Sequence, residues 1–427
     1  MTPEDNELLT RVGPGTLMGE LLRRYWLPLL LSEELPLPDG APRRMRLLGE
    51  DLVAFRDSGG RVGLLAEACP HRRASLFFGR NEEGGLRCVY HGWKFDVAGR
   101  CLELPSEPPS SRFREGVRAR AYPCRELNGV VWAYLGPAEE APPLHQLAWA
   151  LAPPQRRSVL TYARACNWLQ ALEGDVDTVH LGWLHARVGS GGAREVAFHA
   201  GDRLRDIAVR DRRPVLHVVE TPAGLSIGAR RDDGAGGLYW RVSQFLMPIF
   251  TSVPAIGHQR RAKAWVPLDD EHTLVWEANW YPTDELAAGK DATSERRTPE
   301  SGMLPDTEDP LERGRFAANV ENDYRIDRER QRMSNFSGIE DSPPLQDAAV
   351  QESMGPIVDR SGEHLVASDE GVIRVRRRLL DAARRLRDLA EEPPGVSAPS
   401  AYRLRGCQMV LPQGVDWQEA TREEQTS

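Results

Sequence analysis

The chain contains 427 residues, 41% hydrophobic and 28% charged, and its 55 Lys+Arg against 63 Asp+Glu give a formal net charge of -8. This mixture is typical of globular proteins and excludes wholesale disorder, while an acidic balance without a basic block argues against a nucleic-acid binder. The length predicts two domains, and apolar runs far shorter than the roughly 20 residues that cross a bilayer predict no membrane partner.

The N-terminal third of the chain reads as a short leading segment followed by a small all-β unit. Residues 1–42 contain a predicted helix over 17–27, and we expect this segment to pack on the larger, C-terminal domain. In residues 43–140, apolar and polar positions alternate and turn signals recur about every ten residues, which predicts short strands. Residues 141–156 are rich in Pro and Ala and predict a linker.

Residues 157–391 predict a second domain of mixed composition. A helix is expected over 163–185, and five apolar stretches then favour an antiparallel sheet: 215–219, 225–229, 239–250, 262–266 and 274–280. We expect a mobile loop over 283–312, helices over 345–358 and 368–391, and a poorly ordered C-terminal tail over 392–427. The predicted fold class is therefore α+β, an all-β domain plus a domain with an antiparallel sheet covered by helices.

Two Cys/His pairs in the all-β unit predict a metal centre. Cys69-Pro70-His71 is separated by sixteen residues from Cys88 and His91, which is followed by Gly-Trp-Lys-Phe-Asp. Two Cys and two His bind either tetrahedral zinc or a [2Fe-2S] cluster in which the cysteines hold one iron and the histidines the other. Each pair runs Cys-then-His between strands and turns rather than on a helix, which favours the iron–sulfur cluster.

A second group of potential ligands lies on the predicted helix of the larger domain. Two histidines and a carboxylate beside open positions are typical of non-haem Fe(II) sites. On a regular helix Asp177 and His180 lie about 60° apart, but His180 and His185 lie about 140° apart, which is wide for one ion. We therefore predict a distorted or broken helix at 181–184, near Gly182. From these residues alone, two histidines that bind no metal are an equally good interpretation.

The first motif resembles the Rieske domain of ring-hydroxylating oxygenases. The resemblance implies that Cys69 and Cys88 bind the inner iron of a [2Fe-2S] cluster and that His71 and His91 bind the outer iron. Neutral imidazoles on one iron raise the potential relative to four thiolates. The cluster is then expected to accept electrons from a flavin or ferredoxin donor and to pass them on.

The segment Asp-x-x-His-x-x-x-x-His resembles the mononuclear-iron motif of the same family. The resemblance implies that His180 and His185 are ligands of Fe(II) and that Asp177 joins His180 to His91 of the partner subunit. The third ligand is expected on the late helix, where the stretch 346–356 nominates Asp347, with Glu352 and Asp359 as rivals. The chain departs from some relatives at Glu173, where they carry an Asn.

Residues 6–15 and 321–324 look like the phthalate 4,5-dioxygenase branch of the family. This resemblance implies a terminal oxygenase component that uses O₂ and electrons from an NAD(P)H-dependent reductase to hydroxylate or O-demethylate an aromatic, carboxylated substrate. It also implies a homotrimer or homohexamer and a role in aromatic hydrocarbon catabolism. The alternatives are a Rieske electron-transfer protein without oxygenase activity and a zinc-stabilised binding protein.

The substrate pocket is expected on the late sheet. Arg230 and Arg241 are candidates for binding a carboxylate, but only three of the 55 basic residues are lysines, so most arginines of this chain are expected at the solvated surface. The first residues, 1–6, lack the basic start of a signal peptide. We therefore expect a cytoplasmic protein whose six cysteines are reduced or metal-bound.

Overall fold

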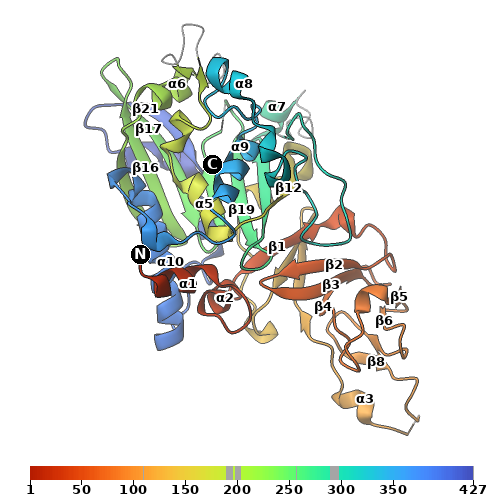
Figure 1. The fold of residues 1–427 in the computed structure, drawn as a ribbon. Coiled ribbons are helices and arrows are strands. Elements are labelled where there is room, and N and C mark those ends of the chain that lie inside the picture. Colours follow the sequence, from red (N-terminus) through yellow and green to blue (C-terminus); the bar gives the residue numbers. More distant parts are fainter. Residues whose placement is uncertain (109, 189–195, 198–202, 256, 289–297, 427) are drawn as a thin grey trace.

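The computed structural model describes the whole chain except residues 109, 189–195, 198–202, 256, 289–297 and 427. Its elements form a smaller β-rich part and a larger part in which helices cover a curved antiparallel sheet (Figure 1). The predicted α+β class is confirmed. Among the described residues, no helix combines the length and the apolar character needed to cross a membrane.

The smaller part contains two four-stranded antiparallel sheets. One has the order β2-β3-β4-β9, and the other has the order β5-β6-β7-β8. A turn at Asp57 joins β3 to β4, because the Asp57 carboxylate accepts hydrogen bonds from the backbone N–H groups of Gly59 and Arg61. The strands are β2 (Arg43–Leu47), β3 (Glu50–Arg56), β4 (Val62–Ala66), β5 (Arg80–Glu82), β6 (Gly85–Arg87), β7 (Lys94–Phe95), β8 (Cys101–Glu103) and β9 (Ala121–Tyr122).

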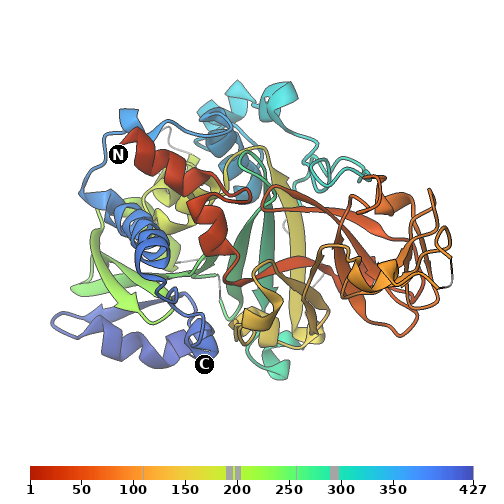
Figure 2. The ribbon, with the colours of Figure 1, turned by 90° about the horizontal axis from the view of Figure 1, so that it is seen from below.

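The leading segment contacts both parts. The strand β1 (Trp26–Leu31) pairs with β11 (Val130–Tyr134), which also pairs with β10 (Cys124–Leu127). Helices α1 (Pro3–Thr10) and α2 (Leu17–Leu22) pack against α10 (Glu370–Leu389), as the view from below shows (Figure 2). The predicted helix over 17–27 therefore ends at Leu22, and apolar residues from Trp26 onward form a strand instead.

The larger sheet has the order β12-β20-β19-β18-β17-β16-β15, and β21 pairs with β17. Every pairing is antiparallel, as the succession of strands predicted. The strands are β12 (Arg157–Arg164), β15 (Val215–Thr221), β16 (Gly224–Asp232), β17 (Gly237–Leu246), β18 (Phe250–Val253), β19 (Arg260–Pro267), β20 (Thr273–Trp280) and β21 (Cys407–Pro412).

Helices cover this sheet. Helix α5 packs on β17, β18 and β19, helix α10 packs on β15 and β16, and α9 packs against α5. The other helices are α3 (Phe113–Gly116), α4 (Ala148–Leu151), α5 (Trp168–Val176), α6 (Arg203–Arg210), α7 (Asp284–Ala287), α8 (Arg328–Met333), α9 (Pro343–Ser353) and α11 (Trp417–Thr426). The short strands β13 (Arg187–Val188) and β14 (Val196–Ala197) pair with each other.

Two further expectations about secondary structure are wrong. The predicted helix over 163–185 begins only at Trp168, because residues 157–164 pair with β20 along their whole length. The C-terminal segment is not a poorly ordered tail, since β21 extends the sheet and α11 packs against β21. The expected mobile loop over 283–312 contains α7, and residues 289–297 of it lie outside the described part.

Candidate metal centres

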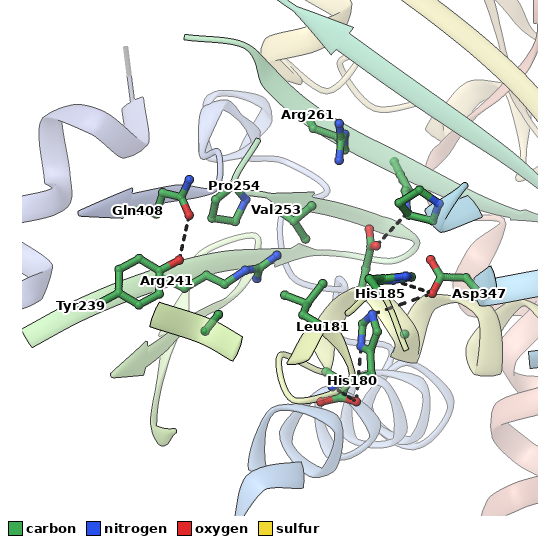
Figure 3. A pocket seen from close by; sticks show the side chains of 16 residues that line it. His180, Leu181, His185, Tyr239, Arg241, Val253, Pro254, Arg261, Asp347 and Gln408 are labelled. Atoms are coloured by element: carbon green, nitrogen blue, oxygen red, sulfur yellow. Dashed lines mark hydrogen bonds and ion pairs between the residues drawn. The ribbon is translucent and has the colours of Figure 1, made fainter. Parts of the chain in front are cut away.

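Three predicted ligands of the second centre converge on one point. The Nε2 atom of His185 lies 3.2 Å from Oδ1 of Asp347, and Nε2 of His180 lies 3.8 Å from the same oxygen. One donor atom from each of the three side chains lies within 4.8 Å of the others. All three line one pocket and point toward one another (Figure 3). This donor set and spacing suit the two-histidine, one-carboxylate site of Fe(II).

A break in the chain brings the two histidines to the same side. Helix α5 ends at Val176, and Asp177 has extended backbone angles, with φ -70° and ψ 124°. Its carboxylate accepts hydrogen bonds from the N–H groups of Val179 at 2.7 Å and of His180 at 3.3 Å, so it stabilises the new turn that begins there. The α-helix ends before Asp177, earlier than the break expected at 181–184. The chain is not α-helical over 181–184 either, because a 3₁₀ turn spans His180–Gly182 and ends at Trp183.

Each imidazole is oriented through its other nitrogen. The Nδ1 atom of His185 lies 2.8 Å from Oε1 of Gln346, and the Gln346 amide in turn donates to the carbonyl of Glu340 at 3.1 Å. The Nδ1 atom of His180 lies 3.4 Å from Oδ2 of Asp177. The hydrogen bond at Nδ1 of His185 leaves Nε2 free as a metal ligand and fixes the tautomer, whereas the contact of His180 with Asp177 is an ion pair. The sequence did not single out Gln346, and its position next to Asp347 was the only available signal.

Helix α9 is fixed to its neighbours on both sides of Asp347. The buried Arg164 donates to the backbone carbonyl of Pro344 and, at 3.2 Å, to Oε1 of Gln351. From α5, the amide of Gln170 donates to the carbonyl of Gln351 at 3.1 Å. Pro344 and Gln351 lie about one turn before and after Asp347, so these contacts hold its side chain at the pocket.

The two rival carboxylates are engaged elsewhere. Glu352 accepts hydrogen bonds from the N–H of Ala165 and from the Tyr324 hydroxyl. Asp359 caps the next turn by accepting a hydrogen bond from the N–H of Ser361 at 2.9 Å. Of the three candidates for the third ligand, Asp347 is the one that shares a point with His180 and His185.

The charges at this centre favour an anionic Asp347. Burial alone would raise the pKa of its carboxyl, but the charge and hydrogen bond of His185 and the charge of His180 outweigh it, so the pKa lies below its usual value. Burial likewise opposes a raised pKa of His180, but the Asp177 carboxylate outweighs it. The two carboxylates thus favour a positive charge at the histidines. A divalent cation bound there would supply that charge.

The four predicted ligands of the first centre lie on two facing loops. Cys69 and Cys88 are buried, and the rings of His71 and His91 lie 4.5 Å apart between their centroids. Each loop is closed by a hydrogen bond onto a cysteine carbonyl, from Arg73 to Cys69 and from Gly92 to Cys88, both at 2.9 Å. Burial, and the neighbouring Cys88, raise the pKa of the Cys69 thiol to about 11. Two adjacent buried thiols need a cationic partner to ionise, which an iron cluster provides.

The Gly-Trp pair after His91 shapes this centre. The ring of His71 stacks on Trp93, with centroids 4.3 Å apart and planes within 9°. Gly92 has a φ of +73°, and a Cβ atom there would lie 3.0 Å from the side chain of Pro105. The turn therefore requires glycine, both for its backbone angle and for its close approach. The arrangement, with two sulfurs inside and two imidazoles facing each other, fits a Rieske cluster.

The two centres lie far apart on one chain. The strands β5, β6 and β8 occupy one end of the molecule, and α5 and α9 lie in the other part (Figure 1). Asp177 therefore does not join the two centres within this chain.

The pocket at His180 and His185 is a small cavity of about 70 Å³ with polar and apolar walls. Arg241 lines it, and the described partner of its guanidinium is the hydroxyl of Ser243 at 2.7 Å. Lys263, which also lines it, is paired with Asp175 at 2.9 Å. The other walls include Leu181, Ala208, Val253, Pro254, Tyr239, Arg261 and Gln408.

The two predicted substrate arginines are placed differently. Arg241 reaches the pocket, whereas Arg230 is not among the residues that line it. The next residue, Arg231, is buried and donates to the backbone carbonyls of Asp211 and Thr178. Gln408 is a lining residue that sequence reasoning missed, because it lies in the segment expected to be a tail.

Comparison with known proteins agrees with this arrangement. A family model described as a Rieske [2Fe-2S] domain matches residues 25–123, and one described as "LigXa C-terminal domain like" matches residues 133–427. The chain is 40% identical to the 3-chlorobenzoate-3,4-dioxygenase oxygenase subunit of Comamonas testosteroni, over 98% of this chain and 97% of that one. It is 39% identical to the phthalate 4,5-dioxygenase oxygenase subunit of Pseudomonas putida, over 98% and 94%.

A solved structure has the same fold. The crystal structure of dicamba monooxygenase bound to dicamba aligns with a TM-score of 0.58 and 18% identity, covering 87% of this chain and 99% of that one.

Proposed function

The chain belongs to the Rieske oxygenases as an oxygenase subunit with a LigXa-like catalytic domain, and we propose that it oxidises an aromatic acid bound through Arg241. The observation that carries this proposal is the convergence of His180, His185 and Asp347 in a pocket that also contains this buried arginine. A buried guanidinium whose described partner is a neutral hydroxyl favours an anionic ligand. The relatives named for 3-chlorobenzoate and phthalate act on aromatic acids, which supports the same class.

We propose His180, His185 and Asp347 as the ligands of Fe(II), and Cys69, His71, Cys88 and His91 as those of the [2Fe-2S] cluster. When bound, Fe(II) supplies positions at which O₂ and the substrate meet. The protein's own contribution is orientation. Gln346 and Asp177 fix the two imidazoles, Leu181 and Val253 exclude water, and Arg241 holds the substrate's carboxylate.

Electron transfer is proposed to run between subunits. Exposed apolar side chains lie near both centres. Val89 and Tyr90 precede His91 in sequence, and Trp183, which follows His180, contacts Phe336. Residues 43–140 contain more basic than acidic residues, although the whole chain is acidic. Both features favour docking of this part onto the catalytic part of a second copy.

In a closed ring each subunit docks its Rieske part on the catalytic part of the next subunit. The simplest such assemblies are a homotrimer and two stacked trimers. In it, Asp177 accepts an N–H from His180 and from His91 of the partner subunit, which links the two centres by a short path. An NAD(P)H-dependent reductase is the proposed electron donor. None of the six cysteines forms a disulfide, which favours the cytoplasm as the compartment.

The test is NADH-driven O₂ uptake with a reductase from a related system and a panel of aromatic acids, with products identified by mass. We expect O₂ uptake coupled to a hydroxylated or O-demethylated product. Iron analysis should give about three irons per chain, whereas a pure electron-transfer protein would contain about two. Two irons per chain, or no product from any aromatic acid, would refute the proposal.

A further inference from the structure

The last strand of the chain contributes to the pocket next to the substrate-binding arginine. In the pairing of β17 with β21, Arg241 lies directly opposite Gln408. Directly opposite residues of an antiparallel pair project from the same face of the sheet. Both side chains line the pocket, and Figure 3 shows them at the side away from His185 and Asp347. The two side chains thus form one polar wall, made by segments more than 160 residues apart in sequence.

The Gln408 amide is held in a defined orientation. Its oxygen accepts a hydrogen bond from the Tyr239 hydroxyl at 2.8 Å, and its nitrogen donates to the carbonyl of Ala255 at 3.2 Å. Because the oxygen is used as an acceptor and an amide nitrogen carries two hydrogens, one N–H of Gln408 is left for a ligand. This donor is fixed by Tyr239 on β17 and by Ala255 just after β18, so it does not have to be ordered when a ligand binds.

The strand that carries Gln408 is firmly attached. The N–H of Gly406 donates to the Ser252 hydroxyl at 2.9 Å, which anchors β21 at its start. On the opposite face of β17, the ring of Trp240 stacks on Trp417 of α11, with centroids 5.2 Å apart. These contacts make the wall a rigid part of the domain rather than a loosely packed end of the chain.

We propose that Gln408 is a specificity-determining residue that, together with Arg241, binds the carboxylate of the substrate. The guanidinium supplies the charge and the amide N–H binds a carboxylate oxygen, so that the acid is recognised by geometry as well as by charge. Leu181 and Val253 lie between this wall and the histidines (Figure 3), and they contact the aromatic ring. The inference rests on the proposed function, because it specifies how the same pocket selects an acid.

The test compares two ligands of the same shape that differ in charge, 3-chlorobenzoate and 1-chloro-3-nitrobenzene. Binding to the anaerobic, iron-loaded enzyme is measured by calorimetry, independently of turnover. In Gln408→Leu we expect binding of 3-chlorobenzoate to weaken roughly tenfold to a hundredfold, because a hydrogen bond to a charged group is lost. Binding of the nitro compound should change less than about threefold. Gln413→Leu, the same substitution at an exposed position beyond β21, should bind both ligands as the wild type does.

Gln408→Glu provides a second variant, which keeps the acceptor for the Tyr239 hydroxyl while removing the N–H donor. It should weaken binding of 3-chlorobenzoate at least as much as leucine does. Equal weakening of both ligands would show that Gln408 only fills space, and unchanged binding of the acid would likewise overturn the inference while leaving the proposed function intact. A wild-type enzyme that binds no aromatic acid would overturn both.

Discussion

Replacing Glu173 with glutamine should destabilise the protein by about 3–5 kcal/mol, the typical effect of removing one partner from a buried ion pair. The Glu173 carboxylate accepts hydrogen bonds from Arg376 at 2.7 and 2.9 Å and from Arg360 at 3.2 Å. Arg376 retains a second carboxylate, Glu363, when Glu173 is neutralised. Arg360 is fully buried, and its other described side-chain partner is the uncharged Asn6 amide oxygen, at 3.0 Å. Most of the effect therefore comes from Arg360, left as a buried charge without a counter-ion.

Glu220→Gln is the matched control. Glu220 also pairs with two arginines, Arg374 and Arg378, at 3.6 and 3.1 Å, but its side chain is 59% exposed. Exposed ion pairs contribute about 0–1 kcal/mol, so this variant should remain close to the wild type. Urea unfolding followed by circular dichroism measures both. Equal losses in the two variants, or a neutral Glu173→Gln, would refute the argument from burial.

The effect should also depend on pH. Burial would raise the pKa of Glu173, but the charge of Arg360 and the hydrogen bonds of Arg376 outweigh it and lower the pKa in the folded protein. A lowered pKa contributes stability above the unfolded-state value, near 4.5, and this stability is lost as the pH falls. The difference between wild type and Glu173→Gln should thus be full at pH 7 and shrink below about pH 4.5.

Four further changes have defined outcomes. Asp347→Ala should reduce the iron content from about three to about two per chain and leave the visible spectrum of the cluster unchanged; three irons in the variant would exclude Asp347 as a ligand. Gln346→Leu should weaken Fe(II) binding roughly 10- to 100-fold, measured by metal competition, because His185 loses the partner at Nδ1. Asp177→Asn should retain both metal centres but slow single-turnover product formation, and a wild-type rate would exclude the bridge. Burial lowers the pKa of His145 to about 3, so stability should fall by about 1.4 kcal/mol per pH unit between pH 6.5 and about 3, and His145→Phe should remove this component from pH-dependent urea unfolding.

The candidate ligands that the sequence predicted belong to motifs of closely spaced residues. The Cys69 and Cys88 loops are short, so their motif places ligands without knowledge of the rest of the fold. His180 and His185 could be nominated in the same way, but the break that brings them together lies at Asp177, where the carboxylate binds the N–H of Val179. Helical periodicity does not predict a hydrogen bond from a side chain to the backbone that ends a helix.

Long-range pairing explains what the sequence did not predict. Gln408 reaches the pocket because β21 pairs with β17, a contact that no local pattern in a Pro- and Ser-containing segment signals. The two candidate arginines lie on neighbouring strands, and the register that sends Arg241 into the pocket and leaves Arg230 out of its lining depends on how those strands pair. The strands between residues 215 and 280 and their antiparallel pairing were predictable, since apolar alternation is a local property, but the place of β12 and β21 in the sheet was not.

The pairing of β21 with β17 also has a consequence for the order in which the protein is made. Residues 237–242 of β17 are hydrogen-bonded on one side to β16, but their other side is closed only by residues 407–412. At roughly 5–20 residues per second, synthesis leaves this edge open for about 10–30 seconds after β17 has been made. During that time the half-finished sheet presents unpaired N–H and C=O groups to every nascent chain on the same messenger, and an exposed edge is a template for aggregation. Expression at low temperature or with holdase chaperones should therefore improve the yield of this protein more than that of a variant whose final strand is supplied earlier by circular permutation.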